Sequence, residues 1–351
     1  MTCVKNVARV VVAFLLVSGA AMADIHAPWP TDWNNWNDPA LWVTVGNPGN
    51  LADPETGYGA VAYTFNIGKF EVTAGQYTEF LNAVAKTDTY GLYSTNMLSD
   101  TYGCKIERSG SSGSYTYGVA SDRANRPVSY VSWGDAARFA NWLTHGQPTG
   151  AQDLTTTEDG SYYLNGAITH EALLAVTRKT PEQGGRYYVP TEDEWYKAAY
   201  HKNDGVTGNY FDYPTGSDSV PGRDLSEVTN TGNNANYDVT PDGNPFPIDS
   251  GTYYTTVPGE FQLSDSPYGT FDQGGNIWEW DEAILSGTYR GRRGGSFYYY
   301  SRAMLAGRRD NSATVDEYSG IGFRVSQVPE PATLALLAFG SLLLLRRRGE
   351  R

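Results

Sequence analysis

The chain has 351 residues, of which 13% are aromatic and 19% are charged, and its formal net charge is −13. A chain of this length can form one large domain or two small ones. Strong negative charge opposes binding to nucleic acid, so we expect no nucleic-acid partner.

The first 23 residues have the pattern of a signal peptide. Lys5 and Arg9 precede an apolar run from Val10 to Val17, and "SGAAMA" then supplies the small residues that precede a cleavage site after Ala23. We therefore expect export, with signal peptidase as a processing partner. A short buried helix is the alternative, and it is disfavoured because the charged, apolar, small order lies at the extreme N-terminus.

Residues 24–327 form the predicted body, whose formal charge without the two terminal segments is about −17. Cys3 leaves with the leader, so Cys104 is the one cysteine of the body. An exported domain without an internal disulfide depends on packing or bound ions for its stability. Cys104 has no histidine near it in sequence, and we interpret it as a residue without a functional role.

Three helices are predicted in the body, at residues 72–87, 132–145 and 190–202. Each shows helical spacing of apolar residues after a polar N-cap. The N-cap and the residue three places later are Thr73 with Gln76, Ser132 with Asp135, and Thr191 with Glu194.

Short strands are predicted beside these helices, at residues 63–72, 126–132 and 186–190. The later aromatic segments "GGNIWEW" and "RGGSFYYY" are expected to be buried strands or turns. Gly, Asn, Ser, Asp and Tyr dominate long stretches, and no repeat of 20 to 50 residues occurs. Loops should therefore outnumber regular structure.

The C-terminus reads "VPEPATLALLAFGSLLLLRRRGER", residues 328–351. Its apolar run of 14 residues would span about 21 Å as a helix, short of a hydrocarbon core of about 30 Å. The segment resembles the PEP-CTERM sorting tail of Gram-negative bacteria. That resemblance implies a short transmembrane helix, transient anchoring in the inner membrane, cleavage by an exosortase-type enzyme, and release to the cell surface or extracellular matrix. A plain membrane anchor is the alternative.

Six motifs of the body resemble, in order, the formylglycine-generating enzyme or sulfatase-modifying factor superfamily, from about Gly46 to Val325. They are "IGKFEVTAGQYTEFLN", "RPVSYVSWGDAARFANWL", "YYVPTEDEWYKAA", "YGTFDQGGNIWEW", "RGRRGGSF" and "GFRV". The resemblance implies one α+β domain with a C-type-lectin-like twisted core, little regular secondary structure, and structural calcium.

The catalytic branch of that family carries two copper-binding cysteines, at the second and seventh residues after the phenylalanine of "RGGSF". Counted from Phe297, these places hold Tyr299 and Met304. Neither side chain can supply the thiolate that copper(I) prefers, so we expect no copper. Trp278 and Ser296 match pocket residues of the catalytic branch, but without the thiols we interpret them as residues that build the fold.

The calcium loops of the family are better preserved. In "DQGGNIWEW" the resemblance assigns a first site to Asp272, the carbonyls of Gly275 and Ile277, and the Glu279 carboxylate, which are hard oxygen donors of the kind calcium takes. The alternative is that Glu279 pairs with an arginine such as Arg293.

A second calcium site would use Asn236 and the carbonyl of Tyr237, and its acidic partner cannot be aligned. At this second place, binding of calcium and absence of calcium stay equally open.

Three function classes follow from the sequence. A non-catalytic protein that binds glycan or a surface protein comes first, because aromatic and small polar residues are typical of adaptable binding surfaces. A diverged enzyme comes second and a formylglycine-generating oxidase third, and no metal-binding histidine pattern, nucleophile elbow or phosphate loop supports another chemistry. We expect Tyr299, with Trp278 and Arg293 nearby, to form the binding surface. The alternative is that Tyr298, Tyr299 and Tyr300 are all buried packing. If residues 298–300 alternate as a strand, Tyr299 faces away from its two neighbours.

Overall fold

The computed structural model describes residues 30, 32–225, 232–240, 247–248 and 252–328. The predicted signal peptide and the sorting tail beyond Val328 lie outside the described residues. Within the described part of the chain, no helix is long and apolar enough to cross a membrane.

Among the described residues, two four-stranded sheets and one hairpin form the β structure. The first sheet is antiparallel and has the order β1 (Trp42–Val45), β2 (Phe65–Gly68), β10 (Ser326–Gln327) and β5 (Tyr187–Tyr188). The second has the order β8 (Asp310–Ser312), β7 (Tyr289–Arg293), β6 (Trp278–Leu285) and β9 (Ile321–Gly322). Only β6 and β9 are parallel in this sheet. The hairpin pairs β3 (Ile106–Ser109) with β4 (Thr116–Val119).

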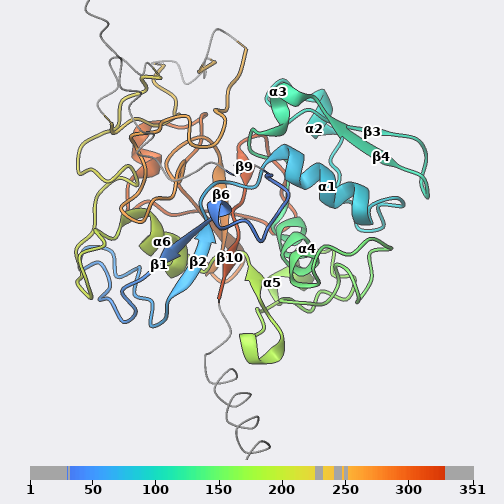
Figure 1. Cartoon of the computed structure of the whole chain (residues 1–351), viewed down its shortest axis with the longest axis horizontal. Helices are drawn as coiled ribbons and strands as arrows, with labels where there is room; N and C mark the ends of the chain where they lie inside the picture. The colour runs from blue at the N-terminus through green and yellow to red at the C-terminus, as the bar shows by residue number, and fades with distance from the viewer. Residues whose placement is uncertain (1–29, 31, 226–231, 241–246, 249–251, 329–351) are drawn as a thin grey trace, which may run out of the picture.

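The helices are mostly short and lie around these strands. The longer ones are α1 (Ala74–Val84), α4 (Trp133–Thr144) and α6 (Glu192–Tyr200). The shorter ones are α2 (Asn96–Ser99), α3 (Ser121–Ala124), α5 (His170–Leu174), η1 (Pro39–Leu41), η2 (Pro181–Gln183) and η3 (Ser301–Met304). In Figure 1 the strands β6, β9 and β10 lie centrally, with α1 and α4 on one side and α6 on the other. The α+β fold with little regular secondary structure is as predicted.

The three predicted helices are confirmed, together with their capping boxes. Thr73, Ser132 and Thr191 each accept from the backbone amide three residues later, and the side chain there returns a bond to the N-cap amide. Loss of such a cap typically destabilises a protein by about 0.5–2 kcal/mol. Because these contacts span only four residues, the sequence alone was enough to locate the three N-termini.

One strand prediction fails for a conformational reason. Residues 126–132 form no strand, only an isolated bridge between Thr73 and Pro127, and Tyr130 has the left-handed φ of +62°. A left-handed residue interrupts the extended backbone that a strand needs. Residues 293–300, for which a strand or a turn was expected, leave β7 at Arg293 and form a turn.

Aromatic side chains fill the core between α1 and α4. Phe139 of α4 packs edge-on against Phe80 at 5.2 Å between ring centroids and stacks on Tyr77 at 6.1 Å. All three rings are fully buried. A fully buried large apolar side chain stabilises the fold by about 1.5–3 kcal/mol, so this cluster contributes strongly to joining the two helices.

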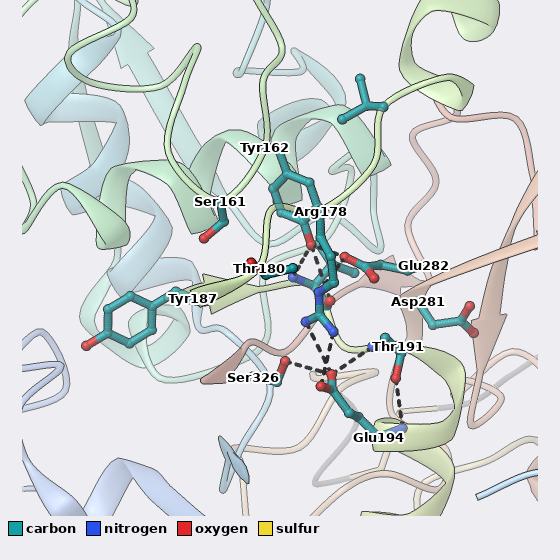
Figure 2. Close-up of polar contacts among 12 residues, drawn as sticks. Ser161, Tyr162, Arg178, Thr180, Tyr187, Thr191, Glu194, Asp281, Glu282 and Ser326 are labelled. Atoms are coloured by element: carbon teal, nitrogen blue, oxygen red, sulfur yellow. Dashed lines mark hydrogen bonds and ion pairs between the residues drawn. The ribbon is translucent and has the colours of Figure 1, made fainter. Parts of the chain in front are cut away.

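A buried polar network joins α6, β6 and β10. Arg178 contacts Glu194 of α6 at 3.1 Å and Glu282 of β6 at 3.3 Å. Tyr162 donates to Glu282, and Ser326 of β10 donates to Glu194 at 3.0 Å. Figure 2 shows the Arg178 guanidinium between the two carboxylates. Such groups are stable away from water because each charge has an opposite charge and further hydrogen bonds.

Candidate functional site

A double-glycine turn carries the chain out of β7 toward the surface. Gly294 and Gly295 have φ values of +95° and +80°. A Cβ on Gly294 would lie 2.6 Å from the carbonyl oxygen of Gln273, and one on Gly295 would lie 3.0 Å from Cβ of Ala303. Both the left-handed backbone and the close approach therefore require glycine here.

The three tyrosines after this turn are exposed together. Tyr298 and Tyr299 are each 42% exposed and Tyr300 is 38% exposed, while the preceding Phe297 is buried. The amide of Tyr299 donates to the Ser296 carbonyl at 2.9 Å, which closes a turn in place of a strand. The strand-like alternation considered above, with Tyr299 on the opposite face, is therefore wrong. The expectation of burial holds for residues 293–297 and fails for the three tyrosines.

Two cavities meet at Tyr299 and Trp278. The larger has a volume of about 800 Å³, and besides Tyr300 its lining carries charged side chains: Asp53, Glu55, Asp212, Arg302 and Arg308. The smaller has a volume of about 370 Å³, and its lining includes Arg292, Tyr298 and Tyr318. Tyr299 thus borders the cleft, as predicted, and stands between its two halves.

Trp278 begins β6 and forms the floor shared by both cavities. Its side chain is 1% exposed, and its ring lies edge-on to Tyr299 with 5.4 Å between centroids. Its indole Nε1–H is buried and has no hydrogen-bond partner among the described residues. An unpartnered buried donor is rare in folded proteins, so a group from outside the chain is a natural acceptor for it.

Arg293 lines neither cavity, contrary to the expectation that it lies at the surface with Tyr299. The side chain is fully buried under the larger cavity, where it contacts Glu192 at 2.6 Å. Its Nη1 donates to the carbonyls of Ala306 and Arg308 at 2.9 and 3.1 Å. Arg293 therefore fixes the segment that lines the cavity from below. The neighbouring Arg292, which the sequence reasoning missed, lines the smaller cavity.

The two positions that hold thiols in the catalytic branch have different surroundings. Tyr299 borders both cavities, whereas Met304 is fully buried and its carbonyl accepts from the Tyr200 hydroxyl at 2.9 Å. Cys104 is buried as well, and burial raises the pKa of its thiol. A raised pKa keeps a thiol protonated and unreactive, in keeping with the interpretation of Cys104 as a residue without a functional role.

One carboxylate of the larger cavity already has a structural task. The oxygens of Asp53 accept from the amide of Glu55 at 2.9 Å, the hydroxyl of Thr56 at 3.1 Å, and the hydroxyl of Tyr196. These bonds close the turn that ends at Gly57. A pair of carboxylates acting on a ligand in this cavity would therefore have to be Glu55 and Asp212.

The first predicted calcium loop is built around an ion pair. The Glu279 carboxylate accepts from Arg324 at 2.5 and 2.6 Å and from Trp195 Nε1 at 2.7 Å. The alternative stated above, that Glu279 pairs with an arginine, is therefore observed, and the arginine is Arg324 and not Arg293. Two of these three donors belong to the positively charged guanidinium of Arg324. A calcium ion on the same carboxylate would be repelled by that charge.

Asp272 is the remaining acidic ligand of that predicted site. One of its oxygens accepts from the Gly259 amide at 2.5 Å, and burial raises its pKa to about 7. Calcium at the first site stays a prediction, and it now depends on Asp272 with the carbonyl oxygens of Gly275 and Ile277. Among the described residues, no three histidine, cysteine or acidic side chains form a metal-binding group.

A third buried carboxylate, Glu71, lies beside this loop and was missed by the sequence reasoning. It accepts from the Asn276 side chain at 2.6 Å and from the Ile277 amide at 3.3 Å. Burial raises its pKa well above the ordinary value, and the charges of Asp272 and Glu279 add to the effect. The sequence signal for this residue was the glutamate of "KFEV". Its partner Asn276 lies about two hundred residues further along the chain, so no local pattern indicated the contact.

The residues of the second predicted calcium site lie against the first loop. The Asn236 carbonyl accepts from the Asn276 amide at 2.7 Å, and its side-chain oxygen accepts from Arg223 at 3.3 Å. Tyr237 is buried and donates its hydroxyl to the Pro221 carbonyl at 2.6 Å. A side-chain oxygen that faces a guanidinium is a poor cation ligand, and calcium here stays a prediction.

Two family models match the chain. The model of the sulfatase-modifying factor enzyme 1-like domain matches residues 47–328, which include all the residues of the cleft described above. The chain belongs to this family. A model of the PEP-CTERM protein-sorting motif matches residues 327–348. This sulfatase-modifying-factor-like protein therefore carries a signal for export, for processing by exosortase-type machinery at the membrane, and for delivery to the cell surface.

Solved structures resemble the domain over most of its length at low sequence identity. CarF has 22% identity and a TM-score of 0.49, with 82% of this chain and 98% of that chain covered. The variable protein 1 of Treponema denticola has 17% identity and a TM-score of 0.48, with 82% and 95% covered. PvdO from Pseudomonas aeruginosa has 19% identity and a TM-score of 0.42, with 82% and 91% covered. The search of curated proteins found no match.

Proposed function

We propose that this sulfatase-modifying-factor-like protein is a surface-delivered binding protein that holds an extracellular glycan in the cleft at Tyr299. In this proposal signal peptidase cuts after Ala23 in a Gram-negative cell, and exosortase-type processing removes the sorting tail. The domain then binds its ligand without catalysing a reaction.

The observation that supports binding is the position of the Tyr299 ring between two cavities. A tyrosine offers an apolar face for the C–H surface of a sugar and a hydroxyl for its edge. Tyr299 is 42% exposed and rests edge-on against the buried Trp278, so its ring is presented at the surface but supported from below. Two cavities on either side of one ring suit a chain of sugar units better than a single small molecule.

The experiment is a pull-down with insoluble extracellular polysaccharides and the purified protein. Tyr299→Ala should abolish binding while circular dichroism shows an intact fold. Tyr163→Ala is the matched control, because Tyr163 is 54% exposed and lines neither cavity. Persistent binding by Tyr299→Ala, or equal loss in both variants, would contradict the proposal.

The absence of formylglycine chemistry is part of the same proposal. Tyr299 and Met304 stand where the catalytic branch carries thiols, and neither side chain can cycle between thiolate and disulfide. Incubation with copper(I), oxygen and a sulfatase-type CxPxR peptide should leave the peptide cysteine unmodified. An aldehyde product detected by mass spectrometry would overturn this part of the proposal.

A further inference from the structure

The smaller cavity contains buried donors that lack acceptors. Trp278 Nε1 and Arg292 Nε are both buried and have no hydrogen-bond partner within the described part of the chain. The Trp278 side chain is 1% exposed, and the Arg292 side chain is 11% exposed. Both residues line the same cavity, so one acceptor could satisfy both donors.

Arg292 is held in place from two sides. Its guanidinium lies over the Trp278 ring, 5.2 Å from the centroid, and its Nη2 lies 3.6 Å from Oδ1 of Asp310. That Asp310 oxygen also accepts from the Asn311 amide at 2.8 Å. The ion pair is long, so the positive charge of Arg292 is only partly balanced by Asp310.

A hydroxyl adds a third donor. Ser296 is 1% exposed and accepts from the Tyr298 amide at 3.3 Å, so it can donate its own hydrogen to a ligand. None of the ten described residues that line the smaller cavity is acidic. The larger cavity differs here, because Asp53, Glu55 and Asp212 line it together with Arg302 and Arg308. The smaller cavity, with Arg292 and no acidic residue, therefore favours a negatively charged group.

We propose that the smaller cavity receives the carboxylate of an acidic sugar, a uronate unit of an extracellular polysaccharide. Its oxygens accept from Arg292, Trp278 and Ser296, as a planar carboxylate does from a guanidinium and neighbouring N–H and O–H groups. The sugar ring then rests on the exposed tyrosines at the rim: Tyr298, Tyr299 and Tyr318. This inference rests on the proposed glycan-binding function and adds the charge and the placement of the ligand.

The test compares three oligosaccharides by isothermal titration calorimetry with the purified full-length protein. The probes are trigalacturonate, its methyl ester, and neutral galactotriose. Loss of a charged hydrogen bond lowers affinity by about tenfold or more, so trigalacturonate should bind at least about tenfold more tightly than the ester. Its affinity should also fall with rising salt concentration.

Variants assign the effect to the cavity. Arg292→Gln should weaken binding of trigalacturonate by about tenfold or more and leave the ester unaffected. Trp278→Phe keeps a ring and removes the N–H, so it should reduce the difference in affinity between trigalacturonate and its methyl ester. Arg186→Gln is the charge-matched control, because Arg186 is exposed and lines neither cavity. If Arg292→Gln fails to fold, Arg292→Lys retains the charge and should keep a preference for the acid over the ester.

Each contrary outcome has a distinct meaning. Equal binding of acid and ester that Tyr299→Ala abolishes would overturn the carboxylate assignment and leave glycan binding intact. An equal loss of affinity for trigalacturonate in Arg292→Gln and Arg186→Gln would show that the carboxylate does not bind in the smaller cavity. Trialanine, which carries a C-terminal carboxylate, is a fourth probe. If it binds more tightly than trigalacturonate, the ligand is a peptide and the sugar assignment is overturned. No binding of any of the three oligosaccharides would overturn this inference together with the proposed function.

Discussion

Arg293 and Tyr299 are six residues apart, yet they belong to two different kinds of region. Arg293 is fully buried and holds Glu192 and two backbone carbonyls, whereas Tyr299 is 42% exposed between two cavities. The double-glycine turn separates them. The residues before the turn belong to the buried, ion-paired interior of the domain, which we call the frame. The residues after the turn form the surface that a ligand can reach.

The comparison teaches which substitutions should affect folding and which should affect binding. Charges of the frame are buried in pairs, so removing one partner leaves an uncompensated charge away from water. Aromatic rings at the surface have few contacts to lose, so their removal changes what the protein can bind.

The largest expected effect is on the ion pair between Arg324 and Glu279. Arg324→Leu leaves a buried carboxylate with only the Trp195 donor, and we expect a loss of about 3–5 kcal/mol in the free energy of unfolding. Urea denaturation measures it. Arg302→Leu, a change at an exposed arginine, should stay within about 0.5 kcal/mol. Similar losses in the two variants would remove the distinction between frame and surface.

Removal of calcium tests whether the stability of the frame also depends on a bound ion. A ligand that binds only the folded state adds about 2.7 kcal/mol at a hundredfold excess over its dissociation constant. If Asp272 and its neighbouring carbonyls hold calcium, EDTA should lower the melting temperature of the wild type and hardly change that of Asp272→Asn. A wild-type melting curve that EDTA leaves unchanged would contradict the calcium prediction.

Glu317 is an intermediate case, since it is partly buried beside the exposed Tyr318. Burial raises its pKa to about 8, the negative charge of Asp135 adds to the effect, and a bond from Ser94 opposes it. Between the unfolded value of 4.5 and about 8, the folded state keeps a proton that the unfolded chain has lost, so stability falls as pH rises.

Glu317→Gln removes this pH dependence. The melting temperature of the variant, minus that of the wild type, should increase from pH 5 to pH 8.5, as differential scanning fluorimetry can measure. Glu79→Gln, on the exposed face of α1, is the control and should show a smaller change. A difference that stays flat across this pH range would place Glu317 in an ordinary solvated setting.

The smallest effect on stability is expected at the surface itself. Tyr299→Ala should change the free energy of unfolding by no more than about 0.5 kcal/mol, although it removes the ring between the two cavities. A chemical denaturation curve measured beside the pull-down separates the two properties. A loss comparable with that of Arg324→Leu would show that Tyr299 belongs to the frame.

The sequence by itself determined the local features. Capping boxes at Thr73, Ser132 and Thr191 were predicted correctly because each depends on groups within four residues, and the ordered motifs were enough to identify the family. The position of Tyr299 at the cleft could also be predicted, because it followed from the family motif.

Only the tertiary structure decided which of the neighbours Arg292 and Arg293 is buried beneath the cleft and which one lines it. Arg293 and Glu192 are 101 positions apart, and Arg324 and Glu279 are 45 apart, so no local pattern reports these pairs. Arg292 and Arg293 are adjacent and chemically identical. Successive side chains of a strand point to opposite faces, and the packing on each face determined that one guanidinium is buried against Glu192 while the other lines the cavity.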